Sequence, residues 1–152
     1  MENILVRGKN KMKIMLREVT EKDWDYILNL RNQFYASSFY KQRKPLESNE
    51  HYEYMKKQKS NPNFHQWIAT IEKNDVGYIG ILDQGINIMV EKRFQTKGIG
   101  TIMLKLVEQN ALKIGIKKLK AIVLVDNESA KKLFVKNNYK LKLYSFEKEL
   151  VE

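Results

Sequence analysis

The strongest constraint on this chain is a short alternating strand that runs through a glycine-containing loop into an amphipathic helix. Ile86, Ile88 and Val90 alternate with other side chains at the period of a strand. The loop 95–100 follows with two glycines, and apolar residues at helical spacing then continue as far as Gly115. Glycines leave the backbone N–H groups room to close on an anion, which the helix dipole also attracts. The segment therefore predicts a strand, an anion-binding loop and a helix, in that order.

The remaining patterns place this unit in one α/β domain. The order of predicted elements is β-α-α-β-β-β-α-β-α-β, which gives a mixed, mostly antiparallel sheet flanked by helices. We expect residues 1–11 to be a polar N-terminal extension, residues 12–152 to be the folded domain, and Asn74-Asp75 to form a turn. The predicted strands cover residues 13–19, 64–71, 76–82, 86–90, 119–125 and 139–150, and the predicted helices cover residues 21–35, 48–59, 99–114 and 127–137.

Composition excludes several classes of protein. A chain of 152 residues is long enough for one domain with a real core and too short for two. Cysteine is absent and there are only two histidines, so no disulfide, thiolate nucleophile or bound metal is expected. No apolar run reaches the roughly 18 residues that span a bilayer, and the first residues lack the pattern of a signal peptide. We therefore expect a cytoplasmic protein with no membrane partner.

The net charge of +10 is concentrated in the C-terminal half of the chain. Residues 92–142 include 13 basic and 3 acidic side chains, which accounts for the whole excess. Such a segment attracts a polyanion, whether nucleic acid, a membrane surface or a phosphate-rich cofactor, although lysines spread over solvated faces give the same total. Only five of the 28 basic residues are arginine, and no helix-turn-helix, zinc or RNA-binding pattern is present. No nucleic-acid partner is therefore expected.

Two motifs carry the chemistry. The first is the loop Gln95-Thr96-Lys97-Gly98-Ile99-Gly100, which follows the strand Asn87-Ile88-Met89-Val90. It is neither a Walker loop, which needs Gly-Lys-Ser/Thr, nor a dinucleotide fingerprint, which needs a third glycine. The second motif is Asn127-Glu128-Ser129-Ala130-Lys131-Lys132-Leu133-Phe134, a predicted helix with Asn127 as its N-cap.

Together these motifs resemble the GNAT superfamily of acyl-CoA N-acyltransferases, over about residues 12–150. The resemblance implies a single-domain GNAT fold that moves acetyl from the co-substrate acetyl-CoA to a primary amine by direct attack, without an acyl-enzyme. It also implies that the amides of Met89 and Val90 polarise the thioester and that Asn127 contacts the pantetheine arm. The residues expected to bind acetyl-CoA are Ile88, Met89, Val90, Gln95, Thr96, Lys97, Gly98, Ile99, Gly100, Thr101, Asn127, Ser129 and Phe134.

One position departs from the family pattern. Phe134 stands where the family often has a tyrosine that protonates the leaving thiolate, and phenylalanine cannot do so. We take Tyr139 as the candidate acid, beside His51 as the other candidate catalytic residue, although a tyrosine at position 139 is more often part of a core. The alternatives are water, no acid at all, or one of Tyr35, Tyr40 and Tyr144.

The acceptor side resembles GNAT enzymes that act on nucleotide-linked aminosugars, and the pseudaminic-acid pathway N-acetyltransferases are the closest such group. The resemblance rests on Arg31-Asn32, followed by Asn49-Glu50-His51-Tyr52. It implies that Arg31, Asn32 and His51 bind the substrate, and that His51 orients the amine or accepts its proton near neutral pH. An ion pair for Arg31 and a packing role for His51 are the alternatives.

Two other functions stay open. Related patterns occur in ribosomal-protein N-terminal acetyltransferases, and a GNAT module that binds CoA without catalysis is the second alternative. The expected partner is a small-molecule amine. The sequence leaves open the natural acceptor, the acyl chain length and the oligomeric state, with a homodimer among the alternatives.

Overall fold

Five strands form one sheet in the order of the chain, β1-β2-β3-β4-β5, and every neighbouring pair is antiparallel. The computed structural model describes residues 4–7, 10–38, 42–95 and 97–151. Two-residue turns join β3 to β4 and β4 to β5, which explains why these strands are neighbours. The strands are β1 (Ile4–Arg7), β2 (Asn10–Glu18), β3 (Phe64–Ile71), β4 (Asn74–Leu82) and β5 (Gly85–Val90).

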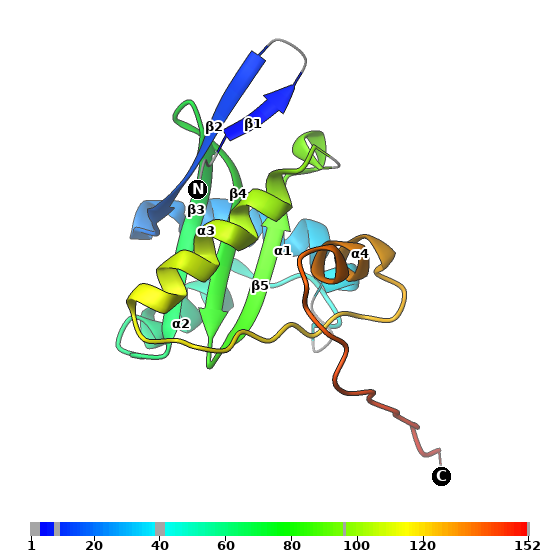
Figure 1. Ribbon diagram of the computed structural model, residues 1–152. Coiled ribbons are helices and arrows are strands. Elements are labelled where there is room, and N and C mark those ends of the chain that lie inside the picture. The colour runs from blue at the N-terminus through cyan, green and yellow to red at the C-terminus, as the bar shows by residue number, and fades with distance from the viewer. Residues whose placement is uncertain (1–3, 8–9, 39–41, 96, 152) are drawn as a thin grey trace.

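Helices cover both faces of this sheet (Figure 1). On one face lie α1 (Trp24–Ser38), which the short helix η1 (Glu21–Asp23) precedes, and α2 (Ser48–Gln58). On the other face lie α3 (Ile99–Lys113), which follows the short helix η2 (Lys92–Phe94), and α4 (Glu128–Lys136). None of the helices in the described ranges has the length and apolarity that a bilayer crossing requires.

Two apolar clusters form because successive side chains of a strand point to opposite faces of the sheet. On the α3 side, Ile79, Ile81 and Met103 are completely buried. On the side of α1 and α2, the cluster includes Tyr78 of β4 and Met89 of β5. The single α/β domain with a mainly antiparallel sheet is therefore confirmed.

An ion-pair network centred on Arg17 ties the end of β2 to η1 and to β4. The guanidinium of Arg17 donates to both carboxylate oxygens of Asp23, at 2.8 and 2.7 Å, and to Asp75 at 3.0 Å. Asp23 also accepts from the backbone N–H of Thr20 at 2.8 Å, which completes a capping box. The hydrogen bonds from Arg17 and Thr20 lower the pKa of Asp23, despite the opposing effect of burial.

Two expectations from the sequence, one about residues 4–7 and one about the turn before β4, need correction. Residues 4–7 are not an extension, because they pair with β2 in the register Ile4↔Lys13 to Arg7↔Asn10. The turn between β3 and β4 falls at Glu72-Lys73, whose φ angles are 49° and 69°, whereas Asn74-Asp75 already belongs to β4. Asn and Asp favour turns locally, but here cross-strand pairing of Asn74 with Ile71 sets the register.

Two predicted strands do not form. Residues 119–125 make a single bridge, between Gly85 and Lys120, and residues 139–150 belong to no helix or strand. Leu143 and Phe146 are 86% and 92% exposed. Apolar alternation predicts a strand only where a partner strand is available, and in residues 139–150 the alternation changes phase between Leu143 and Tyr144.

Replacing Asp23 with asparagine should lower the free energy of unfolding at pH 7 by about 1.5–3 kcal/mol, because charge-assisted hydrogen bonds to Arg17 are lost. Since folding lowers the pKa of Asp23, its contribution is full above the unfolded value of about 3.9 and disappears as pH falls through the folded value below it. Urea unfolding of both proteins at pH 7 and near pH 3 measures this difference. A gap that stays constant over this range would contradict the assignment, and Asp126→Asn, at an exposed position, is the control.

Candidate active site

The outer edge of β5 pairs once with the chain beyond α3 and then opens. Ile86 N–H donates to the carbonyl of Lys120 at 2.7 Å, and Lys120 N–H donates to the carbonyl of Gln84 at 2.9 Å. The parallel bridge between Gly85 and Lys120 is not extended into a ladder in the described residues. Beyond Ile86 this edge of β5 has no paired strand among the described residues, and we call the edge from Ile86 to Val90 the wedge.

Backbone alternation determines which amides face this wedge. Ile86 N–H points away from β4, whereas Glu91 N–H donates to the carbonyl of Val76, at 3.0 Å, and so points in the opposite direction. The direction of N–H and C=O reverses at each residue of an antiparallel strand. The backbone N–H and C=O groups of Ile88 and Val90 therefore face the wedge.

This geometry corrects one predicted pair of amides. Met89 pairs with Tyr78 of β4 and its N–H faces β4, so the amides available for a thioester are those of Ile88 and Val90 instead of Met89 and Val90. The carbonyl of Val90 has the same outward direction, since it accepts from Nε2 of Gln95 at 2.9 Å. That bond also places the first residue of the predicted loop at the mouth of the wedge.

The beginning of α3 meets the requirements of an anion cradle. Gly98 is the N-cap with φ 80° and supplies no side-chain hydrogen bond to the helix. The first turn of a helix has amides without intrahelical acceptors, so Ile99, Gly100 and Thr101 present N–H groups at the positive end of the dipole. The side chain of Ile99 is buried in the core and only its backbone belongs to this cradle. Thr96 lies outside the described residues.

Helix packing also explains why residue 100 is a glycine. A methyl group at this position would lie 3.3 Å from both terminal carbons of Leu133, so glycine lets α3 and α4 approach closely. The amide of Asn137 adds a contact between the same helices, because it donates to the hydroxyl of Thr101 at 3.3 Å and to the carbonyl of Leu133 at 2.8 Å. The predicted cradle residues 98–101 therefore lie beside α4.

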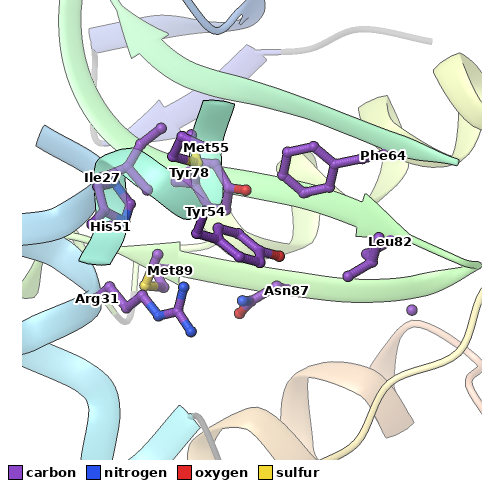
Figure 2. A pocket seen from close by; sticks show the side chains of 12 residues that line it. Ile27, Arg31, His51, Tyr54, Met55, Phe64, Tyr78, Leu82, Asn87 and Met89 are labelled. Carbon is purple, nitrogen blue, oxygen red and sulfur yellow. The ribbon is translucent and has the colours of Figure 1, made fainter. Parts of the chain in front are cut away.

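A pocket lies on the opposite face, between α1, α2 and the ends of β4 and β5 (Figure 2). Its volume of about 80 Å³ is small, and it admits an end group of a substrate rather than a whole nucleotide. The side chains of Arg31, Tyr54 and Asn87 converge on it. The pocket is lined by Ile27, Arg31, His51, Tyr54, Met55, Phe64, Tyr78, Gly80, Leu82, Gly85, Asn87 and Met89.

Arg31, which the sequence motif predicts to bind the substrate, contributes a cation to this pocket. Its guanidinium lies over the ring of Tyr54, 5.6 Å from the centroid, and its Nε donates to Oε1 of Gln42 at 3.0 Å. Burial lowers the pKa of Arg31, which leaves the guanidinium charged because the unperturbed value exceeds 12. The lining residues described above include no aspartate or glutamate.

The other two residues of the acceptor motif have different surroundings. The amide of Asn32 donates to the carbonyl of Leu46 at 3.0 Å and accepts from the N–H of Leu46 at 2.8 Å. Asn32 thus holds the segment before α2 and is not among the residues that line this pocket, and its role in substrate binding stays a prediction. His51 does line the pocket, where it is 1% exposed, and its Nε2 bonds to the carbonyl of Trp24 at 3.0 Å.

The two predicted catalytic residues, His51 and Tyr139, are not brought together. His51 belongs to the α1–α2 side of the sheet, whereas Tyr139 packs against the cluster on the α3 side. The hydroxyl of Tyr139 donates to Glu108 at 3.2 Å, and burial beside that carboxylate raises the pKa of Tyr139. Tyr139 therefore has a structural partner and does not share the pocket of His51.

The predicted helix of the second motif forms, with Asn127 as its N-cap. The side chain of Asn127 accepts from the N–H of Ala130 at 3.1 Å, which confirms the capping role. Ser129 is exposed. Phe134 is 8% exposed and packs edge-on against Tyr139, with 5.1 Å between ring centroids. Phe134 is therefore a core residue in this structure.

Sequence reasoning missed nine of the pocket residues, and Tyr54, Phe64, Tyr78 and Asn87 are among them. Gly80 accommodates the ring of Tyr78, because a methyl group at position 80 would lie 2.5 Å from the Tyr78 hydroxyl. The hydroxyl donates to Oε1 of Gln66 at 3.0 Å. No cluster of three potential metal ligands occurs among the described residues.

Comparisons with known proteins agree with this geometry. A domain from Methanocaldococcus jannaschii is 29% identical, with a TM-score of 0.73 over 84% of this chain and 88% of that one. Spermidine N-acetyltransferase from Vibrio cholerae, solved with CoA and spermine, is 19% identical, with a TM-score of 0.71 over 82% and 79%. A transcriptional regulator from Bacillus halodurans is 14% identical, with a TM-score of 0.71 over 90% and 99%. The last two likenesses show the fold alone.

The sequence profile of the acetyltransferase (GNAT) family matches residues 24–139, which is most of the chain. The chain belongs to this family. It is a GNAT acetyltransferase, an acyl-CoA-dependent N-acetyltransferase, and acetyl-CoA is the co-substrate typical of the family. The residues fit that co-substrate, because the outward amides of Ile88 and Val90 and the uncapped start of α3 are both suited to its oxygens.

Replacing Gly98 with valine should weaken acetyl-CoA binding at least about tenfold, or about 1.4 kcal/mol, because a branched side chain both opposes the positive φ and crowds the amides. Isothermal titration calorimetry measures the affinity. Gly115→Val is the matched control, since Gly115 has φ 87° and open space around it. It should lose a similar amount of stability and keep its affinity. An unchanged affinity in a folded Gly98→Val protein would contradict the cradle.

Replacing Phe134 with tyrosine should lower the free energy of unfolding by about 1–3 kcal/mol, because the hydroxyl enters a dry core without a designed partner. The turnover number should not rise. Phe146→Tyr, at a 92% exposed position, should change stability by less than about 0.5 kcal/mol. Unchanged stability together with faster turnover would instead place the hydroxyl beside the reacting thioester.

Proposed function

We propose that the acceptor amine enters the pocket between α1 and α2 and attacks a thioester held at the wedge beside β5. The observation that carries this proposal is that β5 contributes groups to both the pocket and the wedge. The side chains of Asn87 and Met89 line the pocket, whereas the backbone amides of Ile88 and Val90 face the wedge. Amine and acyl group therefore approach each other across the end of β5.

The chemistry is a direct transfer between two bound substrates. Acetyl-CoA supplies an activated acyl group, the amine nitrogen forms the new C–N bond, and the C–S bond breaks to release CoA as a thiolate. The amine loses one proton and the thiolate gains one from solvent. The outward N–H groups of Ile88 and Val90 donate hydrogen bonds where negative charge develops on the carbonyl oxygen. No side chain on the described wedge has to act as a nucleophile.

We infer that the acceptor is an amine on a negatively charged small molecule, with a nucleotide-linked aminosugar as the leading candidate. Arg31 supplies positive charge at the pocket, and the described lining has no carboxylate that would hold the several ammonium groups of a polyamine. The pocket of about 80 Å³ takes the end that bears the amine, and the nucleotide would lie outside it. The excess of basic residues in the C-terminal half favours the same charge.

The spermidine N-acetyltransferase of V. cholerae has this fold at 19% identity, so a polyamine acceptor is the comparison that the experiment must include. A peptide with an N-terminal amine, as for a ribosomal-protein acetyltransferase, is the third class. The three classes of acceptor differ in charge: the nucleotide sugar is anionic, the polyamine is strongly cationic, and the peptide carries both signs. Charge preference therefore separates them.

The specificity constant for UDP-glucosamine should exceed that for free glucosamine at least about tenfold, because the two amines differ only in the anionic nucleotide that the basic surface attracts. The advantage should shrink as the salt concentration rises. Steady-state kinetics at two salt concentrations, with spermidine and a ribosomal-protein N-terminal peptide as further acceptors, make the measurement. A clear preference for spermidine or the peptide would end the nucleotide-sugar proposal and leave the acetyltransferase assignment in place.

A further inference from the structure

The C-terminal end of the chain presents large apolar side chains that the described residues do not cover. Nine of the twelve exposed large apolar side chains in the described ranges lie between Ile122 and Val151. We call residues 140–151 the C-terminal arm, and its exposed apolar side chains are Leu141, Leu143, Tyr144, Phe146, Leu150 and Val151. Apolar side chains gathered in this way mark an interaction surface.

The arm is anchored at its base. Tyr139, the residue before it, donates its N–H to the carbonyl of Phe134 at 2.9 Å and its hydroxyl to Glu108 at 3.2 Å. Beyond that point the described residues give the arm no backbone hydrogen bond, and Figure 1 shows it leaving α4 and running away from the sheet. The ion pair between Arg43 and Glu149, at 3.6 Å, joins side chains that are 86% and 84% exposed, so it contributes little.

The chain after α3 offers an edge with which the arm can pair. Leu119, Ala121 and Val123 pack against the cluster on the α3 side. Lys120 and Ile122 lie between them and are exposed, so the side chains alternate as they do in a strand. Both backbone groups of Lys120 bond to the chain at the start of β5, so those of its neighbours point to the opposite edge. That edge pairs with no strand in the described part of the chain.

Charge selects the direction in which the arm pairs with this edge. The acidic residues Glu147 and Glu149 lie near the end of the arm, whereas Lys118 and Lys120 lie near the beginning of segment 117–125. An antiparallel register with Glu147 opposite Lys120 places Glu149 opposite Lys118, and both pairs attract. A parallel register would instead bring the basic start of the arm, residues 140–142, towards these lysines.

The same antiparallel register also matches the apolar side chains. It places Tyr144 opposite Val123 and Phe146 opposite Ala121, on the face that packs against the α3-side cluster. The rings of Tyr144 and Phe146 already share one face of the arm, since they stack with 6.4 Å between their centroids. Successive residues of a strand point to opposite faces, so the charged pairs lie on the other face. One register therefore suits both the apolar and the charged side chains.

We propose that the C-terminal arm pairs antiparallel with residues 117–125 of a second copy of this chain, and that two copies exchange their arms. The arm runs away from its own sheet, whereas a second copy presents the same open edge. Each copy gives one arm and receives one, so the contact closes by two-fold symmetry. At about 3.3 Å per residue, an extended arm of this length spans about 40 Å, which is enough to cover segment 117–125. The inference is independent of the acceptor and of the chemistry proposed above.

Complementary charge reversal tests this exchange. Glu147→Lys with Glu149→Lys reverses the arm, and Lys118→Glu with Lys120→Glu reverses the edge. Each double variant should raise the dissociation constant of the dimer at least about tenfold, because like charges then face each other. The two variants produced together should form a mixed dimer whose dissociation constant is within about threefold of the original, because each arm then meets the opposite charge on the other copy.

Analytical ultracentrifugation measures the mass, which for the original protein should be twice that of the 18.1 kDa chain. Lys56→Glu with Lys57→Glu, at exposed positions of α2, is the matched control. It has the net charge of the edge variant, and it should neither weaken the dimer nor form a mixed dimer with the arm variant. The proposal is overturned by an original protein that is monomeric at about 100 μM, where an interface with a micromolar dissociation constant is nearly saturated. A dimer that neither double variant weakens would overturn it as well.

A disulfide distinguishes a second copy from the arm's own copy. The chain has no cysteine, so an introduced pair has no competitor. Ile122 and Ser145 are opposite each other in the proposed register, within the Cα–Cα range of about 4.4–6.8 Å that a disulfide allows. Ile122→Cys with Ser145→Cys should give a covalent dimer on oxidation, whereas Ile122→Cys with Leu141→Cys, which is out of register, should not. Non-reducing electrophoresis makes the measurement. A disulfide within one chain, or none in the matched pair, would overturn the exchange.

Discussion

The site depends on the separation of β5 from the chain that follows α3. Two hydrogen bonds join them at Ile86 and Lys120, and the ladder then stops in the described part of the chain. A complete sheet would satisfy the outward amides of Ile88 and Val90 with a neighbouring strand and leave nothing for a ligand. Because the chain after Lys120 does not pair further with β5, backbone groups that normally stabilise a sheet are available as donors at the candidate site.

The position of β5 between its neighbours explains how one strand could contact both substrates of the proposed function. Its side chains alternate between the two faces, so Met89 reaches the α1–α2 side while Ile88 faces the α3 side. Two glycines in β4 support this arrangement. A methyl group at Gly77 would lie 2.6 Å from the carbonyl oxygen of Met89, and one at Gly80 would meet the Tyr78 hydroxyl. These glycines keep β4 close to β5 and leave room for the aromatic wall of the pocket.

Several elements were predictable because their signals are local. The apolar alternation of residues 64–71 and the helical spacing after residue 98 match β3 and α3, and the Asn127 cap follows from a side chain that bonds three residues ahead. The turn before β4 was misplaced because pairing between strands overrides the local preference of Asn-Asp. The strand expected at residues 139–150 has the right side chains, but pairing needs a partner at the correct place, and sequence alone does not place one.

The sequence by itself determined the strand–loop–helix unit, the capped second motif and the charge, because each depends on residues within one or two turns of each other. It also indicated the family and singled out Arg31 and His51, which line the pocket. Only the tertiary structure decided which amides of β5 face outward, since strand direction relative to β4 and Lys120 sets it. Only the tertiary structure showed that Asn32 and Tyr139 bond to other groups and that Nδ1 of His51 has no partner among the described residues. Those facts depend on contacts between segments far apart in the chain, which local sequence patterns do not predict.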